Sequence, residues 1–278
     1  MTVSLFAVQG SAGSELLLPE PLASGWAPDH MRGMAISGAL ARAVEQTVAA
    51  RGRADLQPAR WTLDLFRPAR MQPCRVSATV VREGRRLCLV DAVFEQADQV
   101  VARASALFLH GGTSPGGVVW SPQRRPLPPS PGLVPDPLEP RLHYSDDAGW
   151  TSSPGGHQNG SRKQVWHFPV SVVKDERPSP FQLVASVADV TNLVTNWGSA
   201  GLQFINADVT LLLARLPAAM EVGLAALDHV QRDGIAVGTA VVYDRVGSLG
   251  TATVSAVANA DRALDVAGRA VGEPRPAP

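Results

Sequence analysis

The sequence predicts an α+β protein made of two copies of one unit, in which an antiparallel sheet wraps a long helix. Three observations lead to this prediction. A helix pattern followed by four strand patterns occurs twice along the 278 residues. A proline-rich stretch separates the two occurrences. Both helices are apolar around most of their circumference, which favours burial inside a sheet that curves around them.

The first unit begins with a helix over residues 34–50. Apolar residues recur in it at helical spacing, at Ile36, Leu40, Val44 and Val48. Four runs typical of strands follow, at residues 59–66, 74–82, 86–96 and 99–110. The dipeptides Glu83-Gly84 and Ala97-Asp98 supply two hairpin turns.

The second unit repeats this order, beginning with a helix over residues 179–196. Ser179 and Gln182 have the spacing of a capping box, which predicts the start of this helix at Ser179. Four strand patterns again follow, at residues 202–214, 219–231, 235–244 and 250–259. Asp233-Gly234 turns one hairpin, much as Glu83-Gly84 is expected to do in the first unit.

Proline marks the boundary between the units. Nine of the 23 prolines fall between Pro115 and Pro140, and proline lacks the amide donor that a packed element needs. We therefore expect four parts: an N-terminal unit (14–110), a proline-rich linker (111–143), a C-terminal unit (144–259) and a flexible tail (260–278). The opening dozen residues are also expected to be loose.

Composition excludes several classes of function. Basic and acidic side chains are equal in number at 25 each, so no basic face for nucleic acid is expected. The sequence has neither a signal-peptide pattern nor a long apolar run, which predicts a cytoplasmic protein without a membrane span. Cys74 and Cys88 lie in predicted strands and are expected to be free, partly buried thiols. No zinc-binding pattern occurs, so we expect no metal and no cofactor.

Several segments together resemble the TesB-like family, the acyl-CoA thioesterase II type of double hot-dog protein. In the first unit they are Arg32-Gly33, LDLFRPA (63–69) and VREGR (81–85). In the second unit they are Ala188-Asp189, FINADVTLLLARLP (204–217) and YDRVGSLGTATVS (243–255). The resemblance extends over residues 14–259 and implies two hot-dog repeats whose sheets join into one continuous sheet.

The resemblance also implies an activity, the hydrolysis of fatty acyl-CoA. In the family, three polar side chains of the second repeat position the attacking water: an Asp on the helix, a Thr or Asn on the next strand and a Gln on the last strand. Asp189 and Asn206 match the first two. The glutamine is missing, because its position falls on Ser255, or on Val254 if the register shifts by one.

The residues themselves support a site at Asp189. Its flanking sequence is too apolar for an exposed helix, and aspartate is a poor residue for a helix interior. A solvent-exposed polar face remains the alternative. Alternation along a strand places Asn206, Asp208 and Thr210 on one face, and Ser255 on a polar stripe, and each face suits either solvent or a site.

The hypothesis is direct attack of water on a thioester carbonyl. Asp189 would act as the general base, while Asn206 and Ser255 hold the water. Backbone amides around Gly33 and Met34, before and within the first helix, would bind the oxyanion. The expected partner is acyl-CoA or another acyl thioester, and strand edges left free by the pairing of the two units would suit a homodimer.

Two alternatives stay open. A non-catalytic protein that binds acyl-CoA or acyl chains could use the same fold, since its apolar lining suits an acyl ligand. A hot-dog dehydratase is indicated only by His167-Phe168-Pro169, where Val170 replaces the glycine that should follow.

Overall fold

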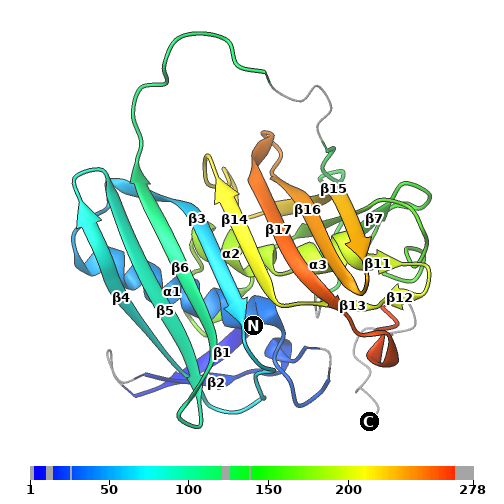
Figure 1. Ribbon diagram of the computed structural model, residues 1–278, viewed down its shortest axis with the longest axis horizontal. Coiled ribbons are helices and arrows are strands. Elements are labelled where there is room, and N and C mark those ends of the chain that lie inside the picture. Colours follow the sequence, from blue (N-terminus) through cyan, green and yellow to red (C-terminus); the bar gives the residue numbers. More distant parts are fainter. Residues whose placement is uncertain (1–2, 11–14, 26, 121–125, 138, 267–278) are drawn as a thin grey trace.

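A computed structural model describes residues 3–10, 15–25, 27–120, 126–137 and 139–266. Its main element is a 12-stranded antiparallel sheet (Figure 1). The first unit contributes β3 (Leu56–Leu65), β4 (Arg75–Gly84), β5 (Leu87–Gln96) and β6 (Gln99–His110). The second unit contributes β14 (Asp208–Leu213), β15 (Val222–Arg232), β16 (Ile235–Tyr243) and β17 (Ser248–Ala258).

The strand order shows the duplication directly. β3 pairs with β14 at the centre of the sheet, with Thr62 opposite Thr210. Going outward from this pair, the order is β6, β5, β4 on one side and β17, β16, β15 on the other. Each side therefore has the same strand order relative to its first strand, and the sheet is continuous across the junction. The predicted double hot-dog architecture is confirmed.

The helices lie together on one side of this sheet (Figure 1). They are α1 (Gly33–Ala50), α2 (Pro180–Ala188) and α3 (Thr191–Asn196). Trp61 of β3 packs edge-on against Phe181 of α2, with ring centroids 5.7 Å apart, so the core runs across both units. The capping box is present, because Ser179 Oγ accepts the Gln182 N–H at 3.0 Å. The single helix predicted over residues 179–196 is instead two helices, interrupted at Asp189 and Val190.

Short strands complete the fold, and the sequence patterns did not predict them. β7 (Arg141–Ser145), β8 (Gly149–Thr151) and β9 (Lys163–His167) extend the large sheet beyond β15. β1 (Ser4–Gln9), β2 (Leu16–Pro19) and β10 (Ser171–Val173) form a separate sheet. The remaining elements are β11 (Trp197–Gly198), β12 (Gly201–Leu202), β13 (Phe204–Asn206), and the 3₁₀ turns Pro21–Ala23 and Ala260–Arg262.

These short strands correct two expectations. Residues 4–9 were expected to be loose but form β1, whose residues pair with both β2 and β10. β7 begins at Arg141, inside the stretch predicted as linker. The last proline of that stretch is Pro140, so the residues after it are free to pair as a strand. Residues 111–120 of that stretch are exposed and lack secondary structure, while residues 121–125, 138 and the tail beyond 266 lie outside the described residues.

Two of the three predicted hairpin turns are confirmed. Ala97 and Asp98 have φ of 47° and 58°, and Asp233 and Gly234 have φ of 50° and 78°. Positive φ at both central residues is the geometry of the two-residue turn that matches strand twist. The turn between β4 and β5 lies at residues 85–86 rather than at Glu83-Gly84. Both predicted turn residues still belong to β4 and pair with residues of β5.

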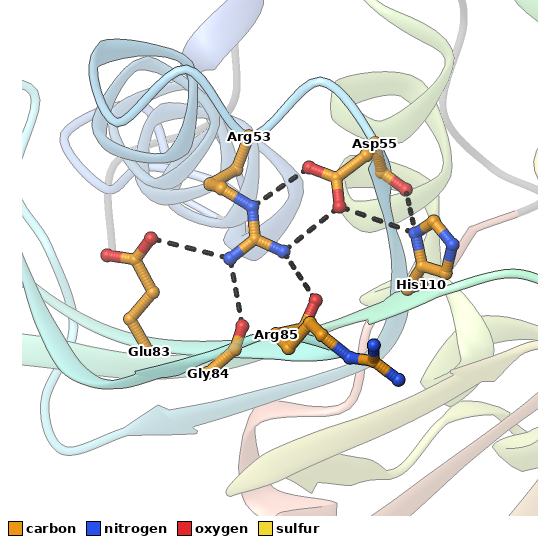
Figure 2. Close-up of polar contacts among 6 residues, drawn as sticks. All are labelled: Arg53, Asp55, Glu83, Gly84, Arg85 and His110. Carbon is orange, nitrogen blue, oxygen red and sulfur yellow. Dashed lines mark hydrogen bonds and ion pairs between the residues drawn. The ribbon is translucent and has the colours of Figure 1, made fainter.

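A charged clamp fixes the C-terminal end of α1 (Figure 2). The Arg53 guanidinium donates to both carboxylate oxygens of Asp55, at 2.8 and 3.0 Å. It also donates to the carbonyl oxygens of Gly84 and Arg85, at 2.9 and 3.0 Å. His110, the last residue of β6, lies 3.3 Å from Asp55. Hydrogen bonds from Arg53 hold the pKa of Asp55 at about 2. Through these contacts the clamp connects the end of the helix to β4 and β6.

Other features agree with the sequence. Cys74 and Cys88 are both buried and free. Among the described residues, no helix is long and apolar enough to cross a membrane.

Candidate active site

Asp189 lies where α2 ends, and its carboxylate lies against the first turn of α1. A Cβ atom at Gly33 would lie only 2.3 Å from Asp189 Oδ1, so only glycine leaves room for the carboxylate. The backbone N–H of Met34 donates a hydrogen bond to the carboxylate. The second unit thus supplies a half-buried acid to the helix of the first unit.

This contact replaces a missing helix cap. The first amides of a helix have no partner within the helix, and a capping side chain normally accepts from one of them. Arg32 occupies the N-cap position of α1 and makes no side-chain cap. The Asp189 carboxylate accepts the Met34 amide instead, and the positive end of the helix dipole favours its negative charge. Asp189 is therefore a structural cap as well as a candidate base.

Asn206 reaches Asp189 because the strand that carries it has a bulge. Asn206 pairs with Ala256 of β17, whereas Thr210 pairs with Thr253. One extra residue therefore lies between these pairs on the β13–β14 side, at Ala207. A bulge of this kind changes the face on which the following residues point. Asn206 shares the inner face with buried Ala256, and its Nδ2 donates to Asp189 Oδ1 at 3.0 Å.

The bulge corrects the expected alternation. Asn206, Asp208 and Thr210 do not share one face, because Val209 is the buried residue after the bulge. Asp208 stabilises the bulge, since its Oδ1 accepts the backbone N–H of Ser255 at 2.6 Å. The structure thus brings together two of the three predicted water-holding residues, Asp189 and Asn206.

The third residue, Ser255, does not join them. Its neighbour Ala256 faces inward opposite Asn206, so Ser255 points to the opposite face of the sheet, where it is exposed. β17 presents only Ala252, Val254 and Ala256 to the interior in this region, and all three are apolar. The register therefore places Val254, rather than Ser255, on the inner face.

The electrostatics of Asp189 follow from its surroundings. Burial raises the pKa of its carboxyl group above the ordinary value of 3.8. The hydrogen bonds from Asn206 and Met34, and the charges of Arg32 and Arg141, oppose this rise. A carboxylate whose pKa is raised is a stronger base than an ordinary aspartate once it is ionised.

The Met34 amide has a different partner from the one expected. It was predicted to help bind an oxyanion, but it donates to the Asp189 carboxylate. Gly33 is the first residue of α1, so its amide has no acceptor within the helix and remains the candidate oxyanion donor.

A small cavity of about 10 Å³, whose lining is apolar in its greater part, lies beside the first turn of α1. Its lining includes Arg32, Met34, Glu139, Arg141 and His167. Glu139 lies 3.5 Å from Arg32 and is bound closely by Arg141 through Nε and Nη2. Met34 lines this cavity, and its backbone N–H donates to the Asp189 carboxylate. The cavity and the candidate base therefore lie on either side of Met34.

Sequence reasoning missed this cavity. Glu139 and Arg141 fell within the predicted linker, and His167 was considered only as part of a dehydratase motif. Arg32 and His167 are far from Glu139 and Arg141 in the chain, and no periodic signal connects them. The described residues also contain no cluster of side chains that could hold a metal ion.

Comparison with known proteins agrees with the fold. Residues 22–109 match the family model of the acyl-CoA thioesterase N-terminal domain, and residues 117–257 match that of the C-terminal domain. A search of curated protein sequences found no match.

Solved structures share the fold at low sequence identity. A tesB protein from Mycobacterium avium subsp. paratuberculosis is 18% identical with a TM-score of 0.62, over 90% of this chain and 95% of that one. A conserved hot-dog protein from Alicyclobacillus acidocaldarius is 17% identical with a TM-score of 0.63, over 91% and 95%. An acyl-CoA thioesterase II, TesB2, from Mycobacterium marinum is 18% identical with a TM-score of 0.56, over 82% and 88%.

One continuous sheet, whose two halves repeat the same strand order and cover helices on one side, defines a double hot-dog protein. The two family matches together extend over most of the chain. The chain belongs to the acyl-CoA thioesterase family.

Proposed function

We propose that this protein hydrolyses acyl-CoA thioesters with a water molecule activated by Asp189. One observation carries the proposal: the Asp189 carboxylate is fixed at the N-terminal end of α1 by Asn206 and by the Met34 amide. A base held in one orientation against a helix N-terminus can serve a reaction that develops negative charge nearby.

Water attacks the thioester carbonyl carbon while Asp189 accepts one of its protons, and Asn206 orients the water. The resulting oxyanion is stabilised by the Gly33 amide and the dipole of α1. The carbon–sulfur bond then breaks, and the coenzyme A sulfur leaves with a proton returned by Asp189. The products are a free carboxylic acid and the coenzyme A thiol.

The outward position of Ser255 favours a second candidate, an acyl-CoA-binding protein without turnover. β17 contributes no polar side chain to hold the water in the interior. Loss of one hydrogen bond to a reacting group costs about 1–3 kcal/mol, which slows a reaction by roughly 5- to 150-fold. Such a loss leaves a slow enzyme, and we therefore retain hydrolysis as the proposed function.

The test measures thiol release from acyl-CoAs of several chain lengths with a thiol reagent. Asp189→Asn is the decisive variant, because its amide oxygen can still accept the Met34 N–H and preserve the cap, whereas it cannot accept a proton. Asp208→Asn is the matched control, since Asp208 is a nearby carboxylate that stabilises the bulge without touching Asp189.

We expect saturable release by the wild type and by Asp208→Asn, and a loss of at least 100-fold in Asp189→Asn. Equal rates in the wild type and Asp189→Asn would reject Asp189 as the base. Saturable acyl-CoA binding without any release by the wild type would establish the binding protein instead.

A further inference from the structure

Asn192 is a buried polar residue close to the candidate base, and the proposed mechanism assigns it no role. It lies three residues beyond Asp189, in α3, and is 3% exposed. Its Nδ2 donates a hydrogen bond to the backbone carbonyl of Phe204 at 3.0 Å. Phe204 is the first residue of β13, and the last residue of this short strand is Asn206.

The carbonyl of Phe204 faces an edge of β13 that no strand covers. β13 pairs with β17 along one edge, and the described residues contain no strand paired with its other edge. The carbonyl of Gln203 accepts from the N–H of Asn259, on the β17 side. Successive residues of an antiparallel strand direct their carbonyls to opposite edges, so the carbonyl of Phe204 points away from β17. Asn192 supplies the hydrogen bond that a neighbouring strand would otherwise supply.

Two side-chain amides thus join the same two segments in opposite directions. Asn206 of β13 donates to Asp189 at the end of α2, and Asn192 of α3 donates back to β13. The bulge at Ala207 interrupts the pairing with β17, so this pairing constrains the strand less at that point. Asn192 therefore fixes the distance between β13 and the start of α3, and with it the distance from the Asn206 amide to the carboxylate.

The orientation of the Asn192 amide is fixed as well. A backbone carbonyl only accepts hydrogen bonds, so Asn192 directs its amide nitrogen toward Phe204 and its amide oxygen away from it. That oxygen accepts from Nδ2 of Asn196 at 2.8 Å. Oδ1 of Asn196 in turn lies 2.9 Å from Nε2 of His229 on β15, which is the donor in this contact. Asn192 is therefore held at both ends of its amide.

We propose that Asn192 is a positioning residue of the hydrolytic site, which holds β13 where the Asn206 amide binds the Asp189 carboxylate. The proposal rests on the proposed function and adds a residue to its machinery. Asn192 acts through Asn206 and contacts neither the water nor the thioester. Asn196 and His229 serve the same end at one remove, because they fix the orientation of Asn192.

Asn192→Leu tests the proposal, because it keeps a similar volume and removes both hydrogen bonds of the amide. Tyr243→Phe is the matched control. Tyr243 belongs to the same unit, is 1% exposed, and donates its hydroxyl to Gln164 Oε1 at 2.8 Å. This buried hydrogen bond joins β16 to β9, so its loss costs stability without moving β13. Thermal melts of each variant show whether it is folded.

A double-mutant cycle in kcat shows whether Asn192 acts through Asn206. Thiol release from an acyl-CoA that the wild type hydrolyses is measured for the wild type, Asn192→Leu, Asn206→Val and the double variant. We expect Asn192→Leu to lower kcat about fivefold in the wild type and less than about twofold in Asn206→Val, because the residue that it positions is then gone. A residue that only stabilises the fold would cost the same in both backgrounds. Tyr243→Phe should keep kcat within about twofold of the wild type.

The pKa of Asp189 gives a second measurement that needs no turnover. It is obtained by carbon-13 NMR titration of protein labelled at the aspartate carboxyl groups, and Asp189→Asn assigns the signal. The hydrogen bond from Asn206 lowers the pKa of Asp189, as do the charges of Arg32 and Arg141. Asn192→Leu withdraws only the first of these, so the pKa should rise by about 0.5 unit or more. Tyr243→Phe should leave it unchanged.

Equal losses of kcat in the two backgrounds, or an Asp189 pKa that Asn192→Leu does not raise, would overturn the inference. A loss of kcat in Tyr243→Phe as large as that in Asn192→Leu would overturn it too. If the wild type releases no thiol, the proposed function fails, and the NMR titration alone decides whether Asn192 holds Asn206 against Asp189. If Asn192→Leu does not fold, Asn192→Ser decides by the same measurements, because its shorter side chain does not reach Phe204.

Discussion

Replacing Gly33 with alanine should move the candidate base by a defined distance. The added Cβ atom would lie 2.3 Å from Asp189 Oδ1, 2.5 Å from its Cγ and 2.6 Å from its Oδ2. Ordinary contacts of a Cβ atom begin at 3.4 Å. The carboxylate must therefore retreat by about 1 Å, which is more than its 3.0 Å hydrogen bond to Asn206 can absorb.

The expected loss of activity follows from that displacement. Misplacing a reacting group by about 1 Å costs roughly 100-fold in rate, which corresponds to about 2.7 kcal/mol in the activation free energy. Tm should fall as well, because alanine is favoured over glycine in a helix by only about 1 kcal/mol, which offsets no more than part of the steric cost. The assay is steady-state thioester hydrolysis, with thermal melts of the same samples.

Gly38→Ala is the matched control for this variant. Gly38 lies on the same helix, and its added Cβ atom would lie 2.5 Å from Ser186 Oγ, so the overlap is similar but does not involve Asp189. We expect Gly38→Ala to lower Tm and to keep kcat within about threefold of the wild type. A Gly33→Ala protein that hydrolyses thioesters at the wild-type rate would refute the argument that the position of this carboxylate limits the reaction.

The rate should fall with decreasing pH around a pKa above 3.8, because Asp189 must be ionised to act and burial raises its pKa; an acid limb at or below 3.8 contradicts this. Asn206→Val should lower kcat by about tenfold or more, and a wild-type kcat would show that this residue does not orient the water. Ser255→Ala should leave kcat within about twofold, since the side chain is exposed on the outer face, and a tenfold loss would reverse that interpretation. Arg53→Leu should lower Tm at pH 6, and the difference from the wild type should shrink as pH falls from 3.8 toward about 2, where Asp55 becomes protonated and loses its ion pair; a difference independent of pH would contradict the clamp.

The parts of the fold that the sequence predicted depend on local signals. Ser179 and Gln182 form the expected cap because the capping contact links residues three positions apart. The turns at Ala97-Asp98 and Asp233-Gly234 likewise need only two residues with positive φ. The strands are long, and their patterns are clear enough to survive errors of one or two residues at their ends.

The site could be predicted only in part, because its geometry depends on register and on distant segments. Asp189 stood out because an acid in an apolar helix is locally anomalous. The bulge at Ala207 reverses the faces after Asn206, and no property of that strand alone reveals it, since it is defined against β17. The same register turns Ser255 outward. Arg32, Glu139 and His167 meet only after both units have folded together.

The pairing of β3 with β14 changes what the connection between the units has to do. Strand pairing, rather than the chain between the units, sets how Gly33 of one unit faces Asp189 of the other. The exposed stretch over residues 111–120 acts as a tether between the two units. It keeps each unit at a high effective concentration relative to the other. Its length and composition can therefore drift without disturbing the site. A break in the tether would convert assembly of the site from an intramolecular event into one that dilution opposes.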